Sequence, residues 1–171
     1  MTLTAQHALE LVTPPLAQPV SLAEAKSQLR VEHNDDDTII SRLIGVAVAY
    51  VDATGALGNC MMTQTWGQWL GQNPGTVTLL LGPVQSVSAV KYYDVNNALQ
   101  TDTLSNYNIL GTKTRTIVAP KNGFNWPTTF QRDDAIQIQY VCGYGGTSYS
   151  VPQNVRHAMM MLVAHHYENR E

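Results

Sequence analysis

The chain has 171 residues, with 10 basic and 13 acidic side chains and a net charge of −3 at pH 7. This length allows one domain with a sizeable insertion, whose core needs neither a metal ion nor a disulfide to fold. Only 13% of the residues are charged, about half the usual share, which favours surfaces buried against other subunits because interface centres are depleted in charge. The few basic residues are scattered along the chain, so tight duplex-DNA binding is not expected.

Membrane insertion and secretion are also not expected. No apolar stretch approaches the roughly 18 residues that a membrane span needs, and the first residues lack the basic start and long apolar core of a secretion signal. The two cysteines, Cys60 and Cys142, have no metal-ligand spacing. We expect them to be free thiols in a reducing compartment.

Residues 1–20 are expected to form an extended N-terminal arm or an edge segment. Three prolines between positions 14 and 19 remove hydrogen-bond donors and favour extended backbone. The arm ends at Ser21, which with Glu24 matches a capping box, the reciprocal pairing that begins many helices. The apolar spacing that follows predicts a helix ending near Val31.

A second helix is predicted directly after the first, with Asn34 or Asp35 as its cap. The three consecutive aspartates at positions 35–37 would lie in its first turn, where the helix dipole favours negative charge. Apolar residues then recur at helical spacing until Gly55, which is expected to end the helix. The helical pair thus occupies residues 21–56.

The pattern changes over residues 58–144, where turn residues recur and apolar residues alternate with polar ones. The alternation is clearest in Ile136–Cys142 and predicts strands with one buried face. We therefore expect an antiparallel β-sheet inserted between helices. Its other strands are predicted at residues 62–70, 76–81, 87–93, 106–110 and 116–119.

A third helix with a wide apolar face is predicted with Pro152 in its first turn, and this C-terminal helix and its tail occupy residues 151–171. The fold class is accordingly α+β: a small helical bundle of two N-terminal helices and one C-terminal helix, with the antiparallel sheet as an insertion. The whole chain, residues 1–171, is expected to be a single domain.

The residue patterns do not support an enzyme. The aspartates at 35–37 lack the alternating ligands of a calcium loop, and His157, His165 and His166 lack the i, i+4 spacing of a zinc site on a helix. The glycine-rich segment 143–146 is not followed by a nucleotide-binding fingerprint, and no activated nucleophile is visible. We expect no catalytic residue, no cofactor and no metal.

Several short segments, considered together, point to one known family. Towards the N-terminus they are residues 19–26, 29–31 and the acidic start and apolar face of 35–50; towards the C-terminus they are 140–145, 151–152 and 156–171. The middle of the chain contributes only Trp66, 82–84, Val90, Tyr92, Trp126 and Pro127. In these residues, and in their order and spacing, the chain resembles the head–tail connector proteins of long-tailed bacteriophages, also called adaptor or head-completion proteins.

The resemblance implies a ring-forming virion protein, of about twelve copies in a closed symmetric assembly. It would lie beneath the portal in the virion neck, join the DNA-filled head to a stopper or tail-terminator protein, and be assembled in the host cytoplasm. The genome would pass through its channel without sequence-specific binding. The negative net charge agrees with this, since a channel that bound phosphates would hinder the passage of DNA.

The resemblance also implies that helices form the ring contacts and that the C-terminal helix or tail docks on the portal. The portal-docking residues would be Tyr167, Glu168, Asn169, Arg170 and Glu171. The helix seam or subunit contact would be formed by Ile40, Leu43, Ile44, Val155, Met159 and Leu162, part of which must be core within one copy.

Three other functions remain open. Another neck or tail-completion protein of the same virion would have the same surface chemistry. A DNA-packaging accessory that binds duplex DNA would need a basic face. A carbohydrate-binding β-module would use Trp66, Trp69 and Trp126, which we expect instead to pack in the core of the inserted sheet.

Overall fold

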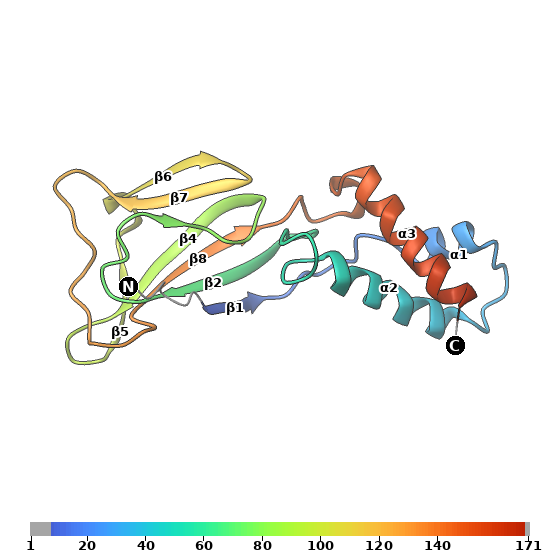
Figure 1. Cartoon of the computed structure of the whole chain (residues 1–171), viewed down its shortest axis with the longest axis horizontal. Coiled ribbons are helices and arrows are strands. Elements are labelled where there is room, and N and C mark those ends of the chain that lie inside the picture. The colour runs from blue at the N-terminus through green and yellow to red at the C-terminus, as the bar shows by residue number, and fades with distance from the viewer. Residues whose placement is uncertain (1–7, 170–171) are drawn as a thin grey trace, which may run out of the picture. The chain divides into compact units, whose positions relative to one another are not determined.

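The structure is a computed structural model that describes residues 8–169. The chain divides into two compact units (Figure 1): a β unit, Met1–Pro14 with Gln64–Cys142, and a helical unit, Pro15–Thr63 with Gly143–Glu171. The α+β class is confirmed. None of the helices within residues 8–169 is long and apolar enough to cross a membrane.

The larger sheet of the β unit has five strands in the order β1-β2-β8-β4-β5, and every neighbouring pair is antiparallel. The strands are β1 (Ala8–Thr13), β2 (Gln64–Leu70), β8 (Ile136–Cys142), β4 (Val84–Tyr93) and β5 (Leu99–Asp102). Strand β1 lies in the predicted N-terminal arm and pairs with β2 at the edge of the sheet. Residues 8–13 of the expected arm are thus an extended edge strand, whereas residues 14–20 belong to no strand.

A second, three-stranded sheet has the order β3-β7-β6. Its strands are β3 (Val77–Thr78), β7 (Arg115–Pro120) and β6 (Tyr107–Thr112), and a 3-10 turn (Leu104–Asn106) precedes β6. The prediction of one sheet was therefore wrong, because strand periodicity locates strands but not their partners. Strand β5 was not predicted, and the strand expected at 76–81 shrinks to two residues because the chain there bonds to side chains instead of a full ladder.

One face of β8 forms the centre of the β unit. Ile136, Ile138 and Tyr140 are completely buried on this face, as the alternation predicted. Tyr140 also accepts a hydrogen bond through its hydroxyl from the backbone N–H of Leu81, at 3.3 Å. Gln68 of β2 lies on the same face, opposite Ile138, and is completely buried as well.

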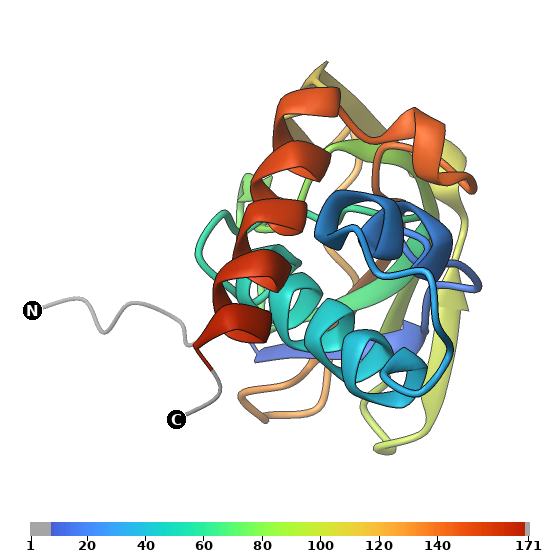
Figure 2. The same ribbon diagram turned by 90° about the vertical axis from the view of Figure 1, so that its right-hand side faces the viewer.

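The helical unit contains α1 (Leu22–Leu29), α2 (Asp37–Val51), a 3-10 turn (Ser148–Ser150) and α3 (Gln153–Glu168). Figure 2 shows α2 and α3 side by side, with α1 packed against both. Three apolar stripes meet between them and form the core of the unit. The fully buried side chains include Val20, Ala25, Ile40, Ile44, Ala47, Met159 and Val163.

The capping box at the start of α1 is confirmed. The Ser21 hydroxyl accepts from the Glu24 N–H at 3.2 Å, and the Glu24 carboxylate accepts from the Ser21 N–H at 2.9 Å. The backbone N–H of Ser21, helped by the Ser21 hydroxyl and by Arg156 of α3, lowers the pKa of Glu24. The helix ends at Leu29, slightly before the predicted Val31, because Arg30 turns left-handed with φ of 57°.

The predicted cap of the second helix was wrong. Helix α2 begins at Asp37, the residue at the N-cap position is Asp36, and its side chain makes no capping bond. The Asn34 side chain binds Lys26 instead of capping the helix. Lys26 donates through Nζ to Asn34 Oδ1, at 2.8 Å, and to Asp37 Oδ1, at 2.7 Å. Of the three aspartates only Asp37 lies in the first turn of the helix.

Candidate subunit interface

An apolar groove with a volume of about 530 Å³ lies in the helical unit, between the C-terminal end of α2, the loop after it and one face of α3. The large apolar side chains that line it are Tyr50, Leu57, Val155, Met161 and Leu162, with the small Ala158 between them. The α3 residues recur three and four positions apart, so they form one stripe along the helix. This stripe adjoins the one that α3 buries in the core, and Val155 and Leu162 contribute to both.

The groove exposes far more apolar side chain than a closed helix seam does. Tyr50 is 63% exposed, Leu57 52% and Met161 57%. Single exposed apolar residues are ordinary, but a contiguous group in a concave site is typical of a surface that binds another protein. The groove is therefore the candidate functional site of the helical unit.

A tight turn after α2 places Leu57 on the groove. The N–H of Ala56 donates to the Tyr50 carbonyl at 2.7 Å, and the Asp52 carboxylate accepts from the N–H of Met61 at 2.7 Å. Gly55 lies so close to α2 that a Cβ there would be 2.4 Å from the Tyr50 carbonyl oxygen. The turn therefore requires glycine at this position because of a close approach of backbone to backbone.

We expect Gly55→Ala to lower the free energy of unfolding of the helical unit by roughly 1–3 kcal/mol, because the added methyl overlaps backbone oxygens. Gly45→Ala is the matched control: Gly45 is inside α2 with nothing within 4 Å of its Cβ position, so alanine should stabilise the helix by about 0.5–1 kcal/mol. Urea unfolding followed by circular dichroism at 222 nm measures both. Equal stability of Gly55→Ala and the parent chain would contradict the role of this turn.

The residues predicted for the helix seam fall into two groups. Ile40, Ile44 and Met159 are buried in the core of a single copy, and Leu43 packs against that core. Val155 and Leu162 also pack against that core, and in addition they line the apolar groove.

Tyr50, Leu57 and Met161 were not predicted to belong to this surface. Tyr50 lies outside the regular apolar stripe of α2, and Leu57 follows the helix in a loop. Met161 is two positions from Met159 on α3, but Met159 is 1% exposed and Met161 57%. Neighbouring positions on a helix point about 100° apart. This spacing was the signal in the sequence that could have separated the exposed Met161 from the buried Met159.

The predicted portal-docking residues lie at the end of α3. The Tyr167 hydroxyl donates to the Asp36 carboxylate, and its ring packs against the helical core. Glu168 and Asn169 are exposed, and Asn169 donates through Nδ2 to the His165 carbonyl at 2.9 Å. Arg170 and Glu171 lie outside the described residues.

Within residues 8–169 the side chains form no site arranged for metal binding or for thiol chemistry. No three His, Cys, Asp or Glu side chains of this range come together as a metal site. His165 and His166 contact each other edge to face with ring centres 5.6 Å apart. Cys60 and Cys142 are buried and form no disulfide, as expected.

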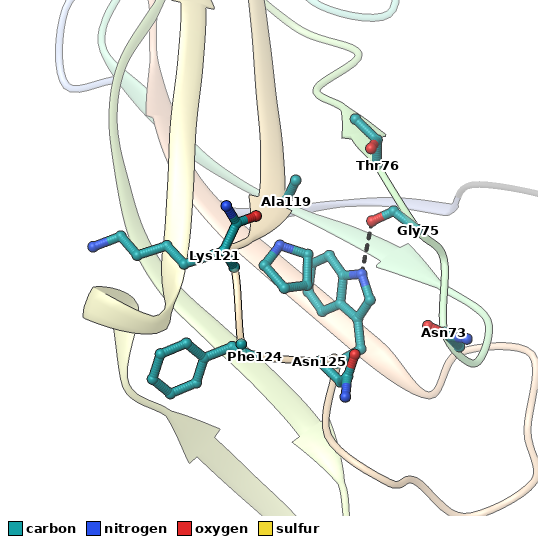
Figure 3. Close-up of a pocket in the computed structure, with 11 residues that line it drawn as sticks. Asn73, Gly75, Thr76, Ala119, Lys121, Phe124 and Asn125 are labelled. Atoms are coloured by element: carbon teal, nitrogen blue, oxygen red, sulfur yellow. Dashed lines mark hydrogen bonds between the residues drawn. The ribbon is translucent and has the colours of Figure 1, made fainter.

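A second cavity, of about 410 Å³, lies in the β unit beside Trp126 and bears on the carbohydrate alternative. The Trp126 indole donates its N–H to the Gly75 carbonyl at 2.7 Å, the dashed line in Figure 3, and its ring packs on Tyr107. Lys121 and Phe124 extend away from Gly75 in the same view. With its ring only 7% exposed and its N–H bonded, Trp126 is a core residue, as predicted, and offers no open platform for a sugar.

Comparison with known proteins identifies the family. Residues 19–116 match the model of the phage gp6-like head-tail connector proteins. No curated protein is significantly similar in sequence.

Three solved structures resemble the chain in fold. A chain in the neck of an empty gene transfer agent particle, computed with C6 symmetry, matches with a TM-score of 0.80 and 18% identity over 96% of this chain and 85% of that one. A chain of the native gene transfer agent virion matches with a TM-score of 0.71 and 17% identity over 95% of this chain and 85% of that one. A chain in the neck of the native gene transfer agent particle, computed with C12 symmetry, matches with a TM-score of 0.71 and 16% identity over 96% of this chain and 85% of that one. The protein belongs to the phage gp6-like head-tail connector family, whose members are structural virion proteins that connect head and tail and not enzymes.

Proposed function

We propose that the protein assembles into a closed ring in the virion neck, seated beneath the portal, with a central channel for the genome. The apolar groove of the helical unit is the observation that carries the ring, because one copy leaves it open. The fold matches support a ring too, since the matched necks were computed with C6 and C12 symmetry. A ring of about twelve copies would fit such symmetry.

The proposed partners are the portal above the ring and a stopper or tail-terminator protein below it. The exposed Glu168 and Asn169 at the end of α3 support portal docking at this end of the chain, with Tyr167 holding the helix end against α2. DNA is proposed to pass through without sequence-specific binding, in accord with the net charge of −3 per copy. Assembly in the host cytoplasm belongs to the same proposal.

Electron microscopy of the full-length protein mixed with assembled portal tests the ring. We expect rings on the portal from the parent chain and their loss with Met161→Lys, which places a charge in the apolar groove. Val95→Lys is the control, because Val95 is 60% exposed but lies in the β unit. Absence of rings from the parent chain at every salt concentration, with and without portal, would contradict the proposed function.

A further inference from the structure

Leu16 is the most exposed large apolar residue within the described chain, with its side chain completely open to solvent at 101% of the reference area. It lies between Pro15 and Pro19 in a short segment before α1. Prolines fix the backbone angle φ and reduce the freedom of their neighbours. Pro15 and Pro19 thus limit the backbone conformations of the segment that presents the apolar side chain.

This segment and the groove are two different sites beside α2. It borders a small cavity together with Val48 and Asp52, whereas Tyr50 lines the groove. Val48 and Asp52 are each two positions from Tyr50, and two residues correspond to a rotation of about 200° around a helix axis. Val51 also lines the groove and is only three positions from Val48, so the Leu16 segment and the groove are distinct sites that meet α2 on adjoining faces.

A closed ring needs this kind of arrangement. In a ring every copy uses one face towards the preceding copy and a different, complementary face towards the next. An aliphatic side chain that its own copy leaves exposed complements a concave apolar surface that one copy cannot fill. The volume of the groove, about 530 Å³, is also large enough to receive a leucine side chain with its flanking residues.

We propose that Leu16 of each copy inserts into the apolar groove of the neighbouring copy, beside Met161 and Leu57. This inference rests on the ring proposed above and names the contact that closes it. The occupant is a second copy of this chain. A segment of the portal or of a tail-side protein in the groove is the competing outcome that the experiment detects.

Covalent cross-linking tests the contact. In Leu16→Cys/Met161→Cys protein, a short bis-maleimide should link neighbours into a ladder of oligomers that ends at the copy number of the ring. The native Cys60 and Cys142 are both completely buried, so they should not react while the protein is folded. Either single variant should give no ladder, because a head-to-tail chain needs both groups on every copy.

Tyr149→Cys/Met161→Cys is the matched control, since Tyr149 is 84% exposed in the same unit. It should give no ladder. A ladder as strong as that of the Leu16 pair would show unspecific collision and would overturn the proposal.

Leu16→Asp provides a second measurement that does not depend on cross-linking. It should abolish rings seen by electron microscopy while leaving the unfolding transition at 222 nm unchanged, because Leu16 makes no buried contact within its copy. Rings of the parent protein without a ladder, or rings retained by Leu16→Asp, would show that the groove holds something else and would leave the ring itself standing. Absence of rings from the parent protein under all conditions would instead contradict the proposed function.

Discussion

Replacing Gln68 by alanine should lower the free energy of unfolding of the β unit by about 2–4 kcal/mol. Gln68 is completely buried and joins the two sheets: its Nε2 donates to the Thr78 carbonyl at 3.1 Å, and its Oε1 accepts from the Leu80 N–H at 3.0 Å. Truncation removes both bonds and leaves two backbone groups that point towards an apolar interior. An unsatisfied group of this kind costs about 1–3 kcal/mol.

Gln68→Leu separates hydrogen bonding from packing. Leucine restores most of the lost volume but neither hydrogen bond, so most of the destabilisation should remain. The control is Gln100→Ala, because Gln100 is exposed and its bond to Asp94 lies in solvent; its effect should stay within about 0.5 kcal/mol.

Tryptophan fluorescence during urea unfolding is the appropriate measurement for these variants. All three tryptophans, Trp66, Trp69 and Trp126, belong to the β unit, whereas all three α-helices belong to the helical unit. The fluorescence transition should shift and the 222 nm transition of the helices should not. Stability of Gln68→Ala within about 0.5 kcal/mol of the parent chain would contradict the bridging role.

The second large effect separates two methionines that are two positions apart. Met159→Ala should lower the free energy of unfolding of the helical unit by about 2–5 kcal/mol, because Met159 is 1% exposed in the core and truncation leaves a cavity. Met161→Ala should change it by no more than about 0.5 kcal/mol, because Met161 is 57% exposed in the groove.

Ring formation should respond in the opposite order. Met161→Ala removes apolar surface from the proposed contact and should weaken rings, although its helical unfolding transition at 222 nm stays unchanged. Folded Met159→Ala protein retains the groove residues and should still form rings below its unfolding transition. Equal loss of stability in both variants would contradict the assignment of Met159 to the core and Met161 to the surface.

Local sequence determined most of the elements of this protein. The capping box of Ser21 and Glu24 predicted the start of α1, because its hydrogen bonds lie within one turn of chain. The strict alternation in Ile136–Cys142 predicted β8 and its buried face, since side chains alternate along any strand. The motifs towards both ends of the chain also gave the resemblance to the connector family, and the family itself is confirmed by the match over residues 19–116.

Tertiary structure decided the features that depend on distant partners. Strand β1 exists because it pairs with β2, more than fifty positions later, and the division into two sheets depends on which strands meet. Helix α2 begins later than predicted, at Asp37, where Lys26 binds both Asn34 and Asp37.

The apolar groove also arises only when α2, its following turn and α3 come together. Helical spacing shows that a residue is on an apolar face, but a wide apolar face can serve both a core and an interface. Met159 and Met161 differ in exposure only because α3 packs with one face on α2 and leaves the adjoining face open. The division between core and contact surface is therefore a property of the packed helices, which no single segment of sequence contains.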